Sequence, residues 1–384
     1  MPATDPAPPH AGIQAATAAP FRVTVGPAVD LERLGRDWRR LQDQADHSFF
    51  QSWYWIRCLL ETTPADPLVV AVWRGDQIVG LAIAFEHDSG GGAVHLCLNH
   101  TGEADYDRIY PEYNGFLCLR GLQDQVVEAA FQALHRHGLG PRRSVATIAM
   151  AGVAPSMVGG AVAAGWKVGV TDHKPHHHVD LTGLRAGGRV YLESLGRNTR
   201  HQIRRSLKHY GETSGPLCVE AAQDLAQAIG FLHDLRELHQ KHWRRRGYPG
   251  AFAAPYFEAF HENLIRQCFD DGVIEIIRVS AGNTDIGFLY HFNYLKTILY
   301  YQSGFAYDDD PRIKPGLTCH YLCVNRYLER DANLYDFMAG DQRYKSNLGQ
   351  SGGELVWLLL NRSQWKYRLT SAWRRAKRVP AQPL

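Results

Sequence analysis

The sequence predicts an α/β (α+β) fold of two tandem halves, each a mixed, largely antiparallel sheet flanked by helices. Three observations support this prediction: the length of the chain, an order of strands and helices that occurs twice, and a short strand motif found once in each half. At 384 residues the chain is long enough for two cores. Hydrophobic residues make up 45% and charged residues 21%, which is the balance of a globular protein.

In the first half, short apolar runs alternate with turn residues. We expect a hairpin of strands 68–73 and 78–85, because residues 74–77 (RGDQ) are turn-forming. The apolar pattern predicts further strands and amphipathic helices. The strands are expected over 94–98, 115–119 and 144–150, and the helices over 123–137 and about 154–164.

The second half repeats this order after two helices. Its helices are predicted over about 224–245, 255–270 and 315–329, and its strands over 273–279, 286–294, 297–305, 334–338 and 354–360. The segment 75–83 (GDQIVGLAI) is similar to 282–290 (GNTDIGFLY). In each, a turn is followed by a β-branched residue, a glycine and an apolar strand, and a glycine within a strand marks a bulge or a close approach. The repetition indicates duplication.

The predicted organisation has five parts. A disordered tail over 1–20 precedes a first domain over 21–175, a linker strand and basic helix over 176–214, a second domain over 215–360 and a basic tail over 361–384. The basic tail holds seven lysines and arginines and no acidic residue, so the rest of the chain is net acidic although the total is +3. This is not the charge profile of a DNA-binding domain.

The sequence favours a cytoplasmic location. Residues 1–20 lack the basic start and apolar block of a signal peptide, and no apolar run is long enough to span a membrane. The seven cysteines are scattered and odd in number, so a disulfide framework is not expected. Aromatic residues among the arginines of the basic tail would allow weak contact with an anionic membrane surface, although a solubilising tail is the simpler interpretation.

Three segments together resemble a known family. The string DFMAGDQRYK at 336–345 resembles the DF-x-x-G-D-x-x-YK signature of the BioF2-like, or CelD-like, acetyltransferases, relatives of the FemAB peptidyltransferases with two GNAT halves. The segment 197–205 looks like the R-x-x-R-x-x-x-R linker helix of that family. Residues 105–107 (DYD) and 113–115 (YNG) resemble its polar first-half loop. The likeness covers roughly residues 21–360.

The resemblance implies an enzyme that transfers an acyl group from acyl-CoA, in the first instance acetyl-CoA, directly to an amine or hydroxyl. It also implies that the acceptor is a small molecule or glycan precursor, and it suggests exopolysaccharide or cell-envelope assembly as the pathway. Two alternatives stay open. One is a FemAB-like peptidyltransferase that uses aminoacyl-tRNA, and the other is a duplicated-GNAT module that binds a partner without catalysis.

A helix start at 312–318 is the candidate donor site. A proline in the first helical turn leaves backbone N–H groups without partners, which suits a pyrophosphate, and neighbouring cations add charge. The resemblance places acyl-CoA here, at Arg312, Lys314, Gly316, Leu317 and Thr318. Thr318 stands where the usual GNAT loop has a second small residue. An ordinary helix start is the alternative interpretation.

The candidate catalytic residues lie on two strands. The resemblance implies that a backbone N–H near 298–305 polarises the thioester carbonyl and that Tyr300 or Tyr301 returns a proton to the thiolate. Alternation places Tyr300 and Gln302 on one face and Tyr301 and Ser303 on the other. Both tyrosines would otherwise be core aromatics.

Carboxylates beside a lysine at the end of the next strand are candidates for the base step. A carboxylate beside Lys345, either Asp341 or Asp336, would accept the proton of the attacking group. Alternatively Asp341 and Lys345 pair only with each other, and Tyr344 beside them is assigned to substrate binding.

Further substrate contacts are expected from the polar loop and the basic helix. Asp105, Tyr106 and Asn114 represent the loop, and Arg200 and Arg204 represent the helix, whose charges would otherwise only face solvent. The run of histidines at 176–178 is not expected to bind a metal, because successive residues of a strand point to opposite faces and at most two of the three could share one ion.

Overall fold

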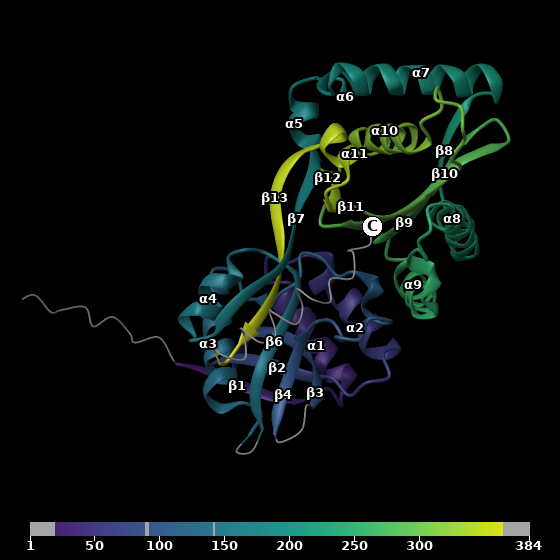
Figure 1. The fold of residues 1–384 in the computed structure, drawn as a ribbon. Helices are drawn as coiled ribbons and strands as arrows, with labels where there is room; N and C mark the ends of the chain where they lie inside the picture. Colours follow the sequence, from purple (N-terminus) through teal and green to yellow (C-terminus); the bar gives the residue numbers. More distant parts are fainter. Residues whose placement is uncertain (1–19, 89–91, 141–142, 364–384) are drawn as a thin grey trace, which may run out of the picture.

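The computed structural model describes residues 20–88, 92–140 and 143–363. The predicted N-terminal and C-terminal tails lie outside this part of the chain, apart from Pro20 and residues 361–363. Two lobes, one for each half of the sequence, are joined by a pair of long strands, and a long helix lies along the far side of the second lobe (Figure 1).

Thirteen strands form one mixed sheet. Those of the first half are β1 (Phe21–Pro27), β2 (Leu68–Arg74), β3 (Gln77–Asp88), β4 (Ala93–Leu98), β5 (Leu117–Cys118), β6 (Ser144–Val153) and β7 (Lys167–Asp180). Those of the second half are β8 (Leu217–Ala221), β9 (Ile274–Ala281), β10 (Thr284–Tyr294), β11 (Thr297–Phe305), β12 (Leu334–Ala339) and β13 (Gln350–Asn361).

Helices cover both lobes. The first half holds α1 (Leu31–Gln42), α2 (Trp53–Thr62), α3 (Gln123–His137), α4 (Met157–Ala163) and the short 3-10 helices η1 (Phe49–Gln51) and η2 (Asp107–Ile109). The linker and the second half hold α5 (Leu181–Ala186), α6 (Tyr191–Ser194), α7 (Arg197–Thr213), α8 (Leu225–Arg245), η3 (Ala251–Ala253), α9 (Pro255–Cys268), α10 (Pro315–Leu328) and α11 (Arg343–Leu348).

The two halves exchange their closing strands. The sheet order is β1-β2-β3-β4-β6-β13-β7-β12-β11-β10-β9-β8. The last strand of the chain, β13, therefore pairs with β6 of the first half, while β7 pairs with β12 of the second half. The two exchanged strands also pair antiparallel with each other from Gln350↔His178 to Asn361↔Lys167. The predicted domain boundary at residue 176 falls within β7.

The repeated strand motif has the same structure in both halves. A β-bulge directly precedes Gly80 in β3 and Gly287 in β10. A Cβ added at Gly80 would lie 2.3 Å from Val126 Cγ1 of α3, and one at Gly287 would lie 2.6 Å from the Phe305 ring and 2.8 Å from the Gly304 carbonyl of β11. Both glycines therefore stand at a close approach, Gly80 to a covering helix and Gly287 to the neighbouring strand, which confirms the predicted close approach and supports duplication.

Most predicted elements are present, and the differences have local causes. The strand expected over 115–119 is reduced to β5, because the polar groups of Asn114 bond the backbone of the loop. The basic helix ends at Thr213, at the end of the predicted linker segment. The segments forming β1, α1, α2 and β8 were not among the predicted elements, although α1 carries a local signal, because the Asp30 side chain at its start accepts a hydrogen bond from the Arg33 N–H.

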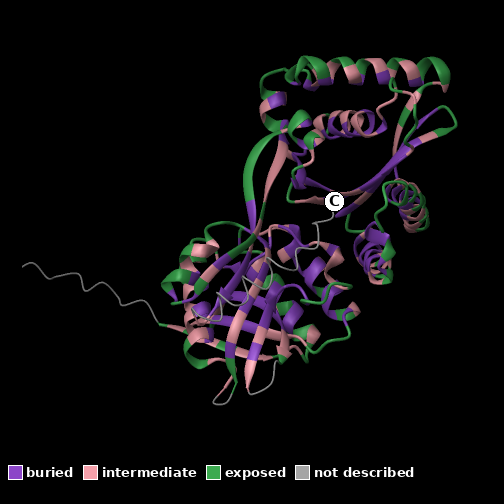
Figure 2. Cartoon of the chain, in the orientation of Figure 1, coloured by how far each residue is buried: buried purple, intermediate pink, exposed green. Residues whose placement is uncertain are grey.

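The core includes aromatic side chains that join the halves. Phe49 of the first half stacks on Phe292 of β10 with ring centroids 4.1 Å apart, and Trp55 of α2 meets Phe260 of α9 at 4.8 Å. Buried residues therefore extend from one lobe into the other, whereas the outer side of α7 is exposed (Figure 2). No helix in the described ranges combines the length and apolarity that a membrane span requires. All seven cysteines are free, and six of them are buried.

We expect that truncation of one side chain on β13 destabilises both halves. Leu360 belongs to the second half by sequence, but its fully buried side chain packs in the core of the first half. Leu360→Ala should lower the free energy of unfolding by about 2–5 kcal/mol, because it leaves a cavity. Denaturant unfolding followed by far-UV and near-UV circular dichroism should show one earlier, coincident transition.

Val170→Ala on the neighbouring strand is the control. Its side chain is 55% exposed, so the change should cost less than about 0.5 kcal/mol. Separate transitions in Leu360→Ala, with only one displaced, would contradict the coupling of the halves through β13.

Candidate active site

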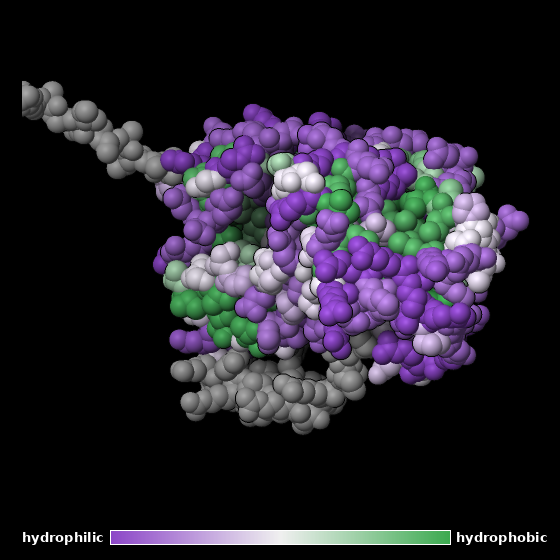
Figure 3. Space-filling model, turned by 90° about the horizontal axis from the view of Figure 1, so that it is seen from above, coloured by the Kyte–Doolittle hydropathy of each residue, from purple (hydrophilic) through white to green (hydrophobic). Residues whose placement is uncertain are grey.

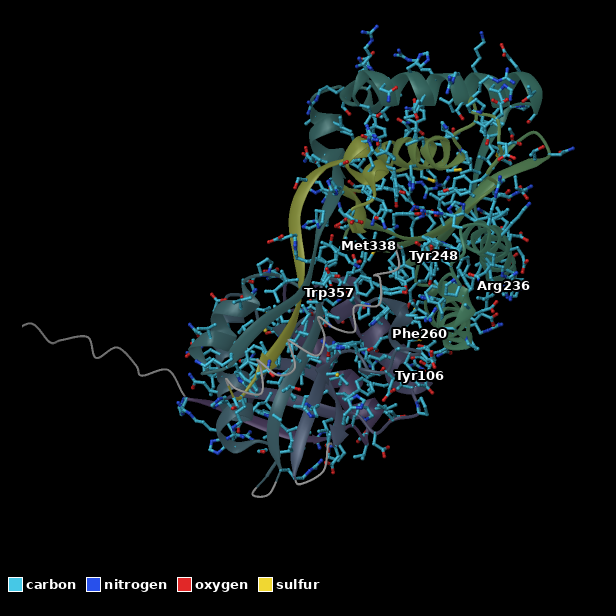
Figure 4. The ribbon with its side chains drawn as sticks, viewed as in Figure 1. Tyr106, Arg236, Tyr248, Phe260, Met338 and Trp357 are labelled. Carbon is cyan, nitrogen blue, oxygen red and sulfur yellow. The ribbon has the colours of Figure 1, made fainter. Side chains whose placement is uncertain are left out.

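The site lies where two parallel strands of the second half separate. β11 and β12 pair only from Thr297↔Leu334 to Leu299↔Asp336. Beyond this point a bulge at Tyr301 bends β11, and the left-handed backbone of Met338 (φ 61°) turns β12 away. A cavity of about 500 Å³, the central cavity, occupies the opening. Met338, on its wall, lies near the junction of the two lobes (Figure 4).

The N-terminus of α10 lies at this cavity. Pro315 opens the helix after Lys314, and the N–H groups of Gly316 and Leu317 have no backbone acceptor. Lys314, Gly316 and Leu317 all line the cavity. Two free N–H groups, the positive end of the helix dipole and a lysine are the groups that bind phosphate oxygens.

The other two predicted donor residues face elsewhere. Arg312 forms a bidentate pair with Asp310 at 2.6–3.1 Å, and this guanidinium lowers the pKa of Asp310 to about 2. Thr318 is fully buried, and its hydroxyl bonds that of Ser206 on α7 at 2.8 Å. The larger residue at this family position therefore packs beneath the helix and does not narrow the cavity.

The bulge changes the predicted arrangement on β11. The sequence prediction put Tyr300 and Ser303 on opposite faces, and this is wrong: their hydroxyls bond each other at 2.5 Å. Tyr301 is the extra residue of the bulge, because Tyr290 pairs with Gln302 and His291 with Tyr300. One inserted residue shifts the alternation of every residue after it.

The two tyrosines therefore have different roles. The Tyr301 hydroxyl donates to the Ile109 carbonyl at 2.5 Å and also lies 2.9 Å from His261 Nε2, so it holds the first-half loop against β11. The Tyr300 hydroxyl faces Ser303 and also interacts with Tyr344. Tyr344 in turn stacks on His320 with centroids 5.3 Å apart. Tyr300, Tyr344 and His320 line the central cavity together, and burial raises the pKa of both tyrosines.

A buried pair of opposite charges borders the same cavity. The Ala339 N–H donates to Glu112 Oε2 at 2.7 Å, and Lys345 Nζ donates to the Ala339 carbonyl at 2.6 Å. Glu112 and Lys345 are only 2% and 5% exposed. Burial raises the pKa of the Glu112 carboxyl and lowers that of the Lys345 ammonium, and the opposite charge of each counteracts the shift of the other.

Asp336 lies on the other side of the cavity wall to which Glu112 and Lys345 belong. It accepts hydrogen bonds from the Tyr113 hydroxyl and the Met338 N–H, both at 2.7 Å, and burial raises its pKa. The Tyr113 ring meets His176 of β7 at 5.4 Å. Asp336 faces a second cavity of about 460 Å³, the first-half cavity, which is also lined by Asn114 and Asp124.

The remaining predicted site residues do not reach the central cavity. Asp341 is exposed, makes no hydrogen bond or ion pair within the described ranges, and is not the partner of Lys345 that the sequence suggested as one alternative. Asp105 is exposed, and Tyr106 packs on Tyr256 with centroids 4.6 Å apart. On α7, Arg200 bonds the Glu193 carbonyl and Arg204 faces solvent.

Glu112 is the main residue that sequence reasoning missed. It directly precedes the YNG string that resembles the family loop, but nothing local shows that it is buried against β12. Gln302 and His320 were missed for the same reason, since a polar residue in an apolar strand or helix does not reveal what it faces.

One group of potential metal ligands occurs among the described residues, away from both cavities. His233, Glu258 and Glu262 have ligand atoms within 4.8 Å of one another. Glu258 also bonds Arg236 at 2.6 Å, and this positive charge opposes a cation. The histidines of β7 do not form such a group with other described residues.

The second half matches a known family, and the whole fold matches solved structures. The family model "Acetyltransferase (GNAT) domain" matches residues 197–346. The structure of FemX has a TM-score of 0.56 at 12% identity, over 84% of this chain and 95% of that chain. L-PGS from Bacillus licheniformis has a TM-score of 0.50 at 9% identity, over 88% and 96%.

A conserved protein of unknown function from Bacteroides thetaiotaomicron VPI-5482 has a TM-score of 0.52 at 11% identity, over 89% of this chain and 99% of that chain. These identities are low, so the likeness shows a shared fold. A comparison with curated proteins gives no match.

The buried charge pair predicts a particular pH dependence of stability. Because the pKa of Lys345 is lower in the folded chain, the unfolded chain binds more protons between that pKa and about 10.5, and stability rises with pH there. Glu112→Gln keeps an acceptor for Ala339 but removes the charge that raises the pKa of Lys345. In this variant the free energy of unfolding should therefore begin to rise at a lower pH, and the total rise should be larger than in the wild type. Urea unfolding at several pH values measures both.

Lys345→Met is the matched control, because it should abolish this rise. Identical pH slopes for the wild type and Glu112→Gln would show that the two groups do not interact.

Proposed function

We propose that the chain is a GNAT acyltransferase of the tandem form related to the FemAB and BioF2-like proteins, and that it transfers an acyl group from acyl-CoA directly to an amine or hydroxyl. The match of residues 197–346 to the acetyltransferase (GNAT) family model supports this proposal. Acetyl-CoA is the first candidate donor. One observation carries the proposal. The free N–H groups at the start of α10 lie at the same cavity as Glu112, Lys345 and Tyr300.

The donor would lie between the strands that separate. Gly316 and Leu317 would donate their N–H groups to the pyrophosphate, and Lys314 would add a positive charge. The acyl end would enter between β11 and β12, where the edge of β11 has no partner strand. No cysteine lines the central cavity, which agrees with transfer without a covalent enzyme intermediate.

The positions of the side chains at the cavity support the following proposal for the proton transfers. As the acceptor nitrogen or oxygen attacks the thioester carbon, its proton would pass to the Glu112 carboxylate. The raised pKa of Glu112 makes this carboxylate a suitable general base. As the C–S bond breaks, Tyr300 would give its proton to the sulfur and Tyr344 would stabilise the resulting phenolate. Lys345 donates a hydrogen bond to the Ala339 carbonyl, and this contact holds its positive charge in place beside Glu112.

The acceptor would approach from the side of the first half. Tyr110 and Glu112 from the first half line the central cavity together with Trp243 of α8 and Arg246 directly after it. Aromatic rings with an arginine suit a sugar-containing or anionic acceptor. From the family resemblance we expect the acceptor to be a small molecule or a glycan precursor of the cell envelope or an exopolysaccharide. We expect the reaction to take place in the cytoplasm.

One observation favours a second candidate, an aminoacyl-tRNA donor. α7 packs on the donor loop, since the Lys314 N–H donates to Ser206 Oγ at 3.0 Å, and its outer side exposes Arg197, Arg204 and Lys208. The face seen from above, toward which α7 lies, is largely hydrophilic (Figure 3). A basic surface beside the donor site would suit a nucleic acid as a carrier of the acyl group.

The donor assignment predicts a thermal shift. Coenzyme A and acetyl-CoA should raise the melting temperature in a saturable way, because a ligand of the folded state stabilises it. Gly316→Glu should abolish the shift, since a carboxylate would occupy the anion site. Gly230→Glu, on the exposed surface of α8, is the matched control and should keep it.

The outcome distinguishes the donors. If neither compound shifts the melting temperature and a deacylated tRNA binds in a salt-dependent way that is lost in Arg204→Glu, the acyl-CoA proposal is overturned in favour of the tRNA donor.

The choice of base predicts which carboxylate the reaction needs. Glu112→Gln should lower acyl transfer by about 10²–10⁴-fold, because it removes a general base. Asp341→Asn should change the rate only a few-fold, since Asp341 lies outside the cavity. Thiol release from acetyl-CoA with a panel of amines and amino sugars measures both. In the wild type kcat/KM should rise with pH as Glu112 loses its proton, and this rise should be absent in Glu112→Gln.

Circular dichroism would verify that both variants are folded. Loss of activity in Asp341→Asn with full activity in Glu112→Gln would instead assign the base to Asp341.

A further inference from the structure

The backbone of Ser303 faces the opening between β11 and β12. The Ala306 N–H donates to the Ile286 carbonyl of β10, and successive residues of a strand direct their N–H groups to opposite edges, so residues three apart differ in direction. The N–H and C=O of Ser303 therefore point away from β10. Pairing with β12 has already ended at Leu299, so no strand of the described residues covers this edge. Ser303 lines the central cavity.

The carbonyl of Ser303 is held by a histidine of fixed tautomer. His239 Nδ1 lies 3.1 Å from this carbonyl, and its Nε2 accepts the Ala251 N–H at 3.3 Å. Nδ1 must therefore carry the proton, and burial, which lowers the pKa of His239 to about 4, keeps the ring neutral. This contact fixes the orientation of the Ser303 backbone in the cavity.

The N–H of Ser303 is covered by the side chain of the preceding residue. It donates to Gln302 Oε1 at 3.0 Å. The Gln302 side chain is only half-buried and lines the same cavity, and no described residue receives a hydrogen bond from its amide nitrogen. The amide carbonyl of Gln302 thus occupies the N–H that Ser303 offers on the unpaired edge of β11.

We propose that the Gln302 carboxamide is a stand-in for the acyl carbonyl of the donor, and that Gln302 sets the preference of the site for acylated over free coenzyme A. The proposal rests on the proposed acyl-CoA donor. When an acyl thioester binds, its carbonyl oxygen replaces Gln302 Oε1 on the Ser303 N–H, and the side chain swings aside. When the acyl group has left, the thiol offers no carbonyl and Gln302 returns.

The exchange has a clear energetic consequence. An acyl donor must break one hydrogen bond to make an equivalent one, so Gln302 reduces the net gain from its carbonyl. Free coenzyme A leaves the Gln302 contact in place. Removal of the carboxamide should therefore strengthen the binding of acyl-CoA and leave the binding of coenzyme A unchanged.

Isothermal titration of the full chain with coenzyme A and with a non-hydrolysable ketone analogue of acetyl-CoA tests this. In Gln302→Met, which keeps the length of the side chain, the analogue should bind about 2- to 10-fold more tightly than in the wild type, as expected for one neutral hydrogen bond. The affinity for coenzyme A should not change. Gln350→Met, which removes an exposed glutamine outside the cavity, should alter neither affinity.

Each outcome decides between the two proposals. Binding of both compounds with an unchanged affinity ratio in Gln302→Met overturns the role of Gln302 and leaves the acyl-CoA donor intact, as does equal tightening for both. If neither compound binds the wild type, the donor proposal fails and the role of Gln302 falls with it. Gln302→Leu, measured in the same way, guards against an effect peculiar to methionine.

Discussion

The antiparallel pairing of β7 and β13 is the constraint on which the rest of the structure depends. Each strand begins in one half of the sequence and completes the sheet of the other, so the two halves share a backbone ladder from Gln350↔His178 to Asn361↔Lys167. Lys174 lies over the Trp357 ring at 4.9 Å within this pair. Neither half of the sheet is complete without the strand that it receives from the other, and this sharing fixes the relative position of the two halves.

This fixed junction explains why charged groups can be buried at the site. Glu112 and Tyr113 come from a first-half loop, yet their partners Ala339 and Asp336 lie on β12. A buried carboxylate is tolerated only where hydrogen bonds and an opposite charge compensate its loss of water, and Lys345 supplies that charge. The candidate active site is therefore assembled by the contact between the halves and does not belong to either half alone.

Duplication and divergence are both visible in the two halves. The bulge and glycine of β3 recur in β10, and each glycine stands where a neighbouring element approaches closely. The two helix starts differ, because α10 begins with Pro315 and Gly316 whereas α3 begins with Gln123 and Asp124. A carboxylate at the N-terminus of α3 opposes a phosphate, so only the second half keeps the groups that suit an anionic donor.

The sequence by itself determined the order and type of most elements, since apolar periodicity, turn residues and Pro–Gly helix starts are local signals. It also identified Lys314, Gly316, Tyr300, Tyr344 and Lys345, which the structure brings to one cavity. Only the tertiary structure decided that β13 lies between β6 and β7, that Glu112 is buried beside Lys345, and that Gln302 covers the Ser303 N–H. The physical reason is that strand partners, burial and the bulge at Tyr301 depend on contacts between residues far apart in the chain, and local sequence patterns do not encode them.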